Sequence, residues 1–166
     1  MSRIVTISGT EITKPELLDS AISQIQTLAK LKLIASINRD KDGIPISGTI
    51  SIPSDITHED MLKQKAEMDP AEVTLLETKF PGYFGKGMTY VEAEVRFSTK
   101  NGVVTLSCDE DYPENFSLAQ MIQDHYLSAV VKQAMIEDGY CVEISLGEEG
   151  INVDITEIEQ PVISNY

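Results

Sequence analysis

The densest group of side chains that could bind a metal ion is the acidic run around residue 110. It contains Asp109, Glu110, Asp111 and Glu114. Carboxylate oxygens are hard ligands of the kind that Ca²⁺ and Mg²⁺ prefer. A calcium-binding EF-hand loop also needs Gly at its sixth position and Glu at its twelfth, and this run has no such spacing. We therefore interpret it as a solvated acidic loop, and we expect no metal and no cofactor.

No local catalytic motif is present in the sequence. The two histidines, His58 and His125, stand at no metal-ligand spacing from other ligand-type residues. The glycine-rich stretch 82–87 is too short for a phosphate-binding loop, and no Ser or Thr follows Lys86. It also lies between an expected helix and an expected strand, the reverse of the order that such a loop needs. It is either a plain connection or an aromatic loop that contacts a partner.

The net charge is extreme and unevenly distributed. Of the total of −14, residues 1–60 contribute −2 (six basic, eight acidic) and residues 61–100 contribute zero (six and six). Residues 101–166 contribute −12, from thirteen acidic residues and the single basic residue Lys132. Direct binding to nucleic acid is disfavoured, because affinity for phosphates comes from Lys and Arg. An acidic half favours a basic partner, or it serves solubility alone.

A helix followed by a hairpin organises this acidic part of the chain. Phe116 and Ser117 resemble a hydrophobic staple and an N-cap, which predicts a helix from there to Glu137, ended by Gly139. Apolar and polar residues then alternate on both sides of the loop 147–150, which predicts an antiparallel hairpin with one wet face. Carboxylates would project from that face and its loop: Glu143, Glu148, Glu149, Asp154, Glu157 and Glu159.

The rest of the chain carries similar local signals. Thr13 is a candidate N-cap for a helix to Ala29, and further helices are expected over 57–66 and 69–79. Strands are expected over 1–12, 31–37, 44–52, 90–98 and from about 103 to 108. Pro45 places its strand at or near a sheet edge. Asn101-Gly102 predicts a type I′ turn that sets Thr99 opposite Val104 and Phe97 opposite Leu106.

These elements predict an α+β fold in the order strand, helix, strand, strand, helix, helix, strand, strand, helix, strand, strand. Because hairpins dominate, we expect an antiparallel β-sheet with helices packed on one face. Residues 1–160 would form one domain and residues 161–166 a flexible tail. The chain has no long apolar run and begins directly with a strand-like segment, so we expect a soluble, cytoplasmic protein without a membrane segment. The oligomeric state stays open.

Both ends of the chain resemble a known family. Met1-Ser2-Arg3-Ile4 and the segment 12–18 are similar to the start of an uncharacterised family of cyanobacterial and algal-chloroplast reading frames, whose members begin Met-Ser-His-Phe. The segments 123–126, 139–142 and 149–151 resemble the C-terminal helix and hairpin of the same family. The resemblance implies a fold and carries no assigned activity.

The charge pattern predicts a non-catalytic binding protein that acts through its acidic C-terminal half on a basic protein partner. The most specific version of this hypothesis is mimicry: the partner surface otherwise binds nucleic acid, and the acidic face imitates that nucleic acid. The alternative is an enzyme or small-ligand binder with a pocket between sheet and helices. Its candidate residues would be His125, Tyr126, Tyr83 and Lys86.

Overall fold

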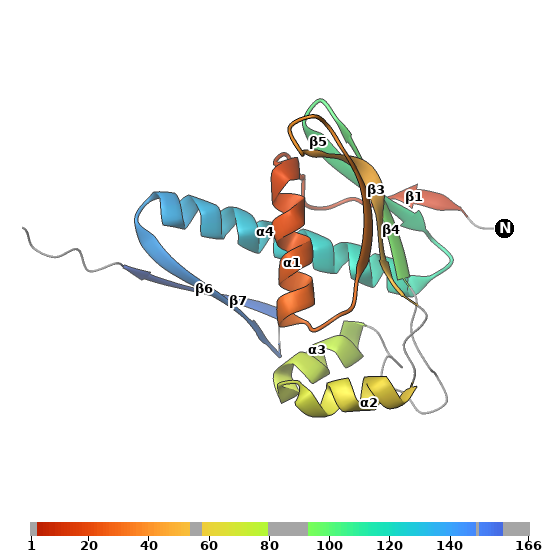
Figure 1. Cartoon of the computed structure of the whole chain (residues 1–166), viewed down its shortest axis with the longest axis vertical. Coiled ribbons are helices and arrows are strands. Elements are labelled where there is room, and N and C mark those ends of the chain that lie inside the picture. Colours follow the sequence, from red (N-terminus) through yellow and green to blue (C-terminus); the bar gives the residue numbers. More distant parts are fainter. Residues whose placement is uncertain (1–2, 54–57, 80–92, 149, 158–166) are drawn as a thin grey trace, which may run out of the picture.

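The computed structural model describes residues 3–53, 58–79, 93–148 and 150–157 (Figure 1). It confirms the α+β class and the expected order of elements. The strands are β1 (Ile4–Thr6), β2 (Ile34–Arg39), β3 (Pro45–Ile52), β4 (Ala93–Lys100), β5 (Val103–Asp109), β6 (Tyr140–Gly147) and β7 (Gly150–Glu157). The helices are the short 3₁₀ turn η1 (Pro15–Leu17), α1 (Leu18–Leu28), α2 (His58–Glu67), α3 (Pro70–Lys79) and α4 (Pro113–Glu137). The tail from residue 161 lies outside the described residues.

Five strands form an antiparallel sheet in the order β1-β5-β4-β3-β2. The turn between β4 and β5 is as predicted, because Asn101 (φ 53°) and Gly102 (φ 77°) both adopt the left-handed conformation of a type I′ turn. The predicted register is confirmed by the pairs Thr99–Val104 and Phe97–Leu106. The turn chemistry and the apolar alternation therefore specify the same pairing.

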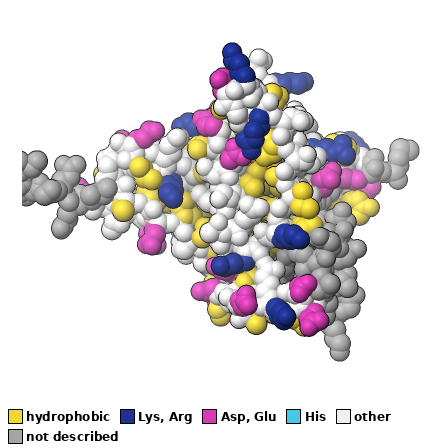
Figure 2. Space-filling view, viewed as in Figure 1, with side chains coloured by type: hydrophobic (Ala, Val, Ile, Leu, Met, Phe, Trp, Pro, Cys, Tyr) yellow, Lys and Arg dark blue, Asp and Glu magenta, His cyan; other side chains and the backbone are white. Residues whose placement is uncertain are grey.

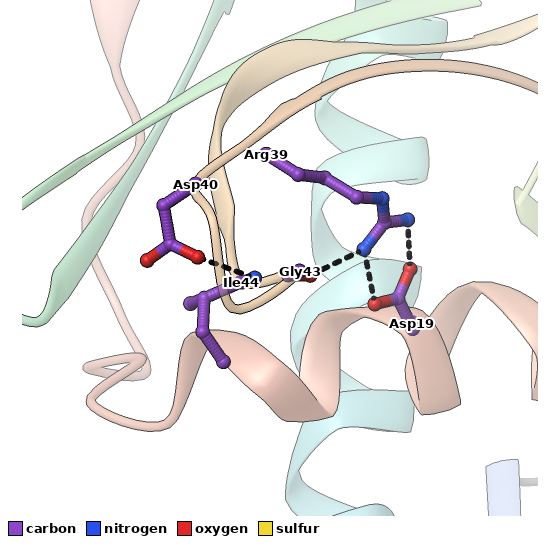
Figure 3. Close-up of polar contacts among 5 residues, drawn as sticks. All are labelled: Asp19, Arg39, Asp40, Gly43 and Ile44. Carbon is purple, nitrogen blue, oxygen red and sulfur yellow. Dashed lines mark hydrogen bonds and ion pairs between the residues drawn. The ribbon is translucent and has the colours of Figure 1, made fainter.

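The turn between β2 and β3 is tied to α1 by one arginine (Figure 3). Arg39 Nη1 and Nη2 donate to the two carboxylate oxygens of Asp19 at 2.8 and 2.7 Å, and Nη1 also donates to the carbonyl of Gly43 at 3.0 Å. Asp40 Oδ1 accepts from the backbone N–H of Ile44 at 3.0 Å and closes the turn. The Asp19 contact raises the pKa of the Arg39 guanidinium above its ordinary value.

Pro45 follows as the first residue of β3, where its missing N–H costs little. β3 is second from the sheet edge and has partners on both sides.

The core lies between one face of this sheet and the helices α1 and α4 (Figure 1). Ile50 of β3 and Val95 of β4 are fully buried there. They belong to the same apolar cluster as Leu18 and Ile25 of α1 and Ile122 of α4. Burial of such side chains contributes roughly 1.5–3 kcal/mol each. α4, at 25 residues, packs on β4, on β5 and on α1, and so joins the parts of the molecule.

Two expected helix caps are wrong. α4 begins at Pro113 and not after Ser117, because proline suits the first helical position and the chain turns at Tyr112. Thr13 does not cap the first helix either, since no side chain makes a capping hydrogen bond at the start of η1 or of α1. The acceptor comes instead from α4: Tyr126 Oη accepts the backbone N–H groups of Thr13 at 3.2 Å and Lys14 at 3.1 Å.

The β6–β7 hairpin is confirmed, and it forms a two-stranded sheet separate from the five-stranded one. Its pairing runs without a shift from Tyr140–Glu157 to Gly147–Gly150. The half-buried residues Val142, Ile144 and Leu146 alternate with exposed ones, and β6 and β7 both contact α4. Alternation predicts such a hairpin, but it does not tell which sheet the hairpin joins.

Candidate interaction surface

The ten acidic residues expected at the binding face fall into two groups. Asp109, Glu110, Asp111 and Glu114 lie at the N-terminal end of α4. Glu143, Glu148, Asp154 and Glu157 belong to the hairpin, and Glu149 and Glu159 lie outside the described residues. The hairpin lies along the later part of α4, because Val142 and Ile144 line the same groove as Lys132. About 27 Å of helix separates residues 114 and 132 at 1.5 Å per residue, so the two groups do not form one face.

The first group is held by local contacts. Asp109 Oδ1 accepts the backbone N–H of Asp111 at 3.0 Å. Glu110 lies 3.7 Å from Arg3 Nε in an exposed ion pair. Within the described part of the chain, no three acidic, His or Cys side chains converge as metal ligands. These residues therefore shape the turn between β5 and α4.

The second group carries like charges that face each other. Glu143 of β6 and Asp154 of β7 are direct cross-strand partners, and both are exposed. Like charges in this position destabilise a sheet by roughly 0.2–1 kcal/mol. Glu148 and Glu157, also exposed, lie near the two ends of the hairpin. The expectation that Glu157 projects from the wet face is wrong, because it lies three residues from Asp154 and so shares the face of Val153 and Ile155. None of the ion pairs found between described residues includes one of these four carboxylates.

Two basic residues of the described chain lie beside the hairpin: Lys79 of α3 lines a cavity with Gly150 and Ile151 at the start of β7, and Lys132 of α4 lies beside β6. The grooves beside Lys132 are the larger ones. Lys132 lines a groove of about 510 Å³ between α1 and α4, together with Ser20, Gln24 and Ile136. It also lines an adjoining groove of about 300 Å³ beside Glu143 of β6. Two cations beside these four carboxylates leave the net charge of the hairpin surface negative.

Two candidates for the alternative pocket, His125 and Tyr126, make internal contacts. His125 is 1% exposed, and its Nδ1 lies 3.1 Å from Gln24 Oε1, to which Ser128 Oγ donates at 2.7 Å. Burial lowers the pKa of His125 to about 4, against a smaller opposing effect of the Asp124 carboxylate. The imidazole is therefore neutral at pH 7, and an amide oxygen partner requires the proton on Nδ1.

Little room exists beside these residues for a substrate. The cavity that His125 lines has about 70 Å³, which suits a water or two at roughly 30 Å³ each. The hydroxyl of Tyr126 accepts hydrogen bonds from the two backbone N–H groups at the start of the first helix. Tyr83, Lys86 and the side chain of His58 lie outside the described residues.

A larger cavity, of about 360 Å³, lies where β4 and β5 separate above the start of α4. It is lined by Glu94, Arg96, Tyr112 and Asp109. Asn115 closes the gap between the strands, since its Oδ1 accepts the N–H of Glu94 at 2.8 Å and its Nδ2 donates to the carbonyl of Asp109 at 3.1 Å. Sequence reasoning missed this cavity, because alternation places Glu94 and Arg96 simply on the wet face.

A second feature missed from the sequence is an exposed apolar side chain on α4. Leu127 is 45% exposed. A signal existed, because Leu127 falls on the same side of the helix as Gln120 and Asp124, which hydrogen-bond to each other at the surface. An exposed leucine on this otherwise polar side of α4 is a candidate contact for a partner.

No family model, no curated protein and no solved structure matches the chain. The resemblance of the two ends to the cyanobacterial and chloroplast family stays a prediction. None of the described helices combines the length and apolar character needed to cross a bilayer.

Proposed function

We propose that the protein is a non-catalytic binding protein that holds a basic protein partner against the exposed face of the β6–β7 hairpin. The observation that carries the proposal is the cross-strand pair of Glu143 and Asp154, which face each other on that exposed side. Glu148 extends the negative charge toward the loop end of the hairpin.

Two physical arguments support a basic partner. A like-charge pair weakens the hairpin, and Lys or Arg side chains placed between the two carboxylates would remove that repulsion. The net charge of −14 also attracts a basic protein over a distance and speeds the encounter. A partner surface that otherwise binds nucleic acid has the required charge.

The test reverses charge on the hairpin. The variant E143K/D154K is immobilised beside the wild type, and partners are captured from a cell extract at about 50 mM and about 500 mM salt, since salt at the higher level screens exposed charges. We expect the wild type to retain a basic protein at low salt, to release it at high salt, and the variant to lose it. The isolated partner should then bind the variant at least about tenfold more weakly.

The matched control is E110K/D111K, which changes the charge equally at the other end of α4. It should retain the partner as the wild type does. Equal loss in both variants would show that net charge alone attracts the partner. Retention at high salt, or retention by E143K/D154K, would contradict the proposal.

A further inference from the structure

We infer that the basic partner binds as an extended segment, which adds a third strand to the edge of β7 opposite β6 and covers Leu127 of α4. This inference rests on the proposed function and specifies how the partner is recognised. The segment would alternate basic and apolar residues, because successive side chains of a strand point to opposite faces.

The edge of β7 has the properties that strand addition needs. Within the described part of the chain, β7 pairs with β6 alone. In an antiparallel pair every second residue directs its N–H and C=O groups away from its partner strand. β7 extends over eight residues, contains no Pro and no Lys, and pairs without a bulge. Its charged side chains, Asp154 and Glu157, oppose pairing with another acidic edge and leave it open to a basic one.

One exposed apolar side chain of α4, Leu127, lies beyond this edge. The β6 residues Val142 and Ile144 lie beside Lys132, and the start of β7 lies beside Asp124. Successive residues of an α-helix are rotated by about 100° around its axis. Viewed along the axis, Lys132 is therefore rotated by roughly 80° from Asp124 in one direction, and Leu127 by roughly 60° in the other. Leu127 therefore lies on the side of β7 that faces away from β6.

The apolar side of β7 is incompletely covered, and so is Leu127 of α4. Ile155 is 44% exposed and Leu127 is 45% exposed. The space-filling view shows hydrophobic side chains at the surface of the part that α4 and the hairpin form (Figure 2). A third strand would lie about 4.8 Å beyond β7, and its apolar side chains would cover both residues.

Charge decides between a partner segment and a second copy of the chain. Two β7 edges placed side by side would bring together the carboxylates Asp154 and Glu157 of both copies, and these repel. A segment with Lys or Arg at alternate positions would instead place its cations beside Asp154 on the exposed face and its apolar residues over Leu127. The charge pattern thus favours the basic segment.

The experiment uses the full chain and an eight-residue peptide of alternating Lys and Val, blocked at both ends and labelled for fluorescence anisotropy at low salt. Two further peptides carry backbone N-methyl groups, either on every Val or on every Lys. Alternate N–H groups point to opposite edges of a strand, so only one set of methyl groups faces β7. We expect one methylated peptide to bind at least about tenfold more weakly and the other to bind within about threefold of the parent.

Protein variants test the contact with Leu127. L127N should weaken binding of the unmethylated peptide about five- to tenfold, as expected for the loss of part of one buried apolar side chain. The matched control I136N alters an equally exposed side chain (51%) on the α1 side of the same helix, and should leave the affinity unchanged. Denaturation curves of both variants establish that each is folded.

The outcomes separate this inference from the proposed function. Equal binding of both methylated peptides, lost in E143K/D154K, would overturn strand addition and leave the acidic hairpin as the binding face. Binding of every peptide that is unaffected by E143K/D154K, or no binding at all, would overturn both. A wild-type dimer in sedimentation that L127N dissociates would identify a second copy as the occupant and overturn the basic segment.

Discussion

At the scale of single residues, two buried polar side chains of α4 hold the molecule together across long sequence separations. His125 contacts Gln24 of α1, and Tyr126 accepts the N–H groups of Thr13 and Lys14. Both residues resemble catalytic candidates in the sequence, yet their partners are internal. Their chemistry is best examined through stability.

His125 makes stability depend on pH. Its pKa is about 4 in the folded protein against an ordinary 6.5, so between these values the unfolded chain binds a proton that the folded one does not. The contribution of the neutral His125 to the free energy of unfolding is therefore fully present above pH 6.5 and is lost as the pH drops toward 4. The loss is about 2–3 kcal/mol between pH 7 and pH 4.5. Urea denaturation at both pH values should show this loss in the wild type, and H125Q should lack that part of it. An identical pH dependence in both proteins would contradict a neutral, buried His125.

Tyr126 should contribute through its hydroxyl. Y126F leaves two backbone N–H groups at the start of the first helix without their acceptor, and we expect a loss of about 1–3 kcal/mol in the free energy of unfolding. Y112F is the control, because Tyr112 is 58% exposed and should change stability by less than about 0.5 kcal/mol. Urea denaturation of both variants measures the difference. An unchanged free energy of unfolding in Y126F would show that water replaces the hydroxyl as acceptor.

At the scale of elements, the cross-strand carboxylates should limit the stability of the hairpin. D154K places a cation opposite Glu143, and we expect a gain of up to about 1 kcal/mol at low salt that shrinks as salt is added. The double variant E143K/D154K restores like charges and should lose the gain. Thermal denaturation of the wild type, E143K, D154K and E143K/D154K forms a double-mutant cycle. A coupling energy of zero would mean that the two side chains point apart.

Helices and strands were predictable where their signals are local. Asp69 caps α3 as its sequence indicates, since its Oδ1 accepts the N–H of Ala71 at 2.9 Å. The cap at Thr13 was wrong because the acceptor comes from Tyr126, which no local pattern reveals. The exposed carboxylates Glu143 and Asp154 of the hairpin were predictable from alternation. Their separation from the group at Asp109, and the edge of β7 beside Leu127, depend on how α4 spans the molecule.

At the scale of the whole molecule, charge repulsion should oppose folding. The ion pairs between described residues lie at the surface and contribute little, whereas a net charge of −14 repels itself in the compact state. We expect the melting temperature to rise by several degrees between about 10 mM and about 300 mM NaCl, because salt screens this repulsion. Calorimetry over this range measures the change. A falling melting temperature would show that attractive pairs outweigh the repulsion.

The hydrogen bonds from Thr13 and Lys14 to Tyr126 also have a consequence for synthesis. They join positions 113 and 112 residues apart, and β1 near the N-terminus pairs with β5. As the chain leaves the ribosome, its first helix has neither its cap nor the surface of α4 against which to pack. Contacts between such distant residues slow folding. The N-terminal segment therefore completes its contacts only after residues up to Tyr126 have left the ribosome.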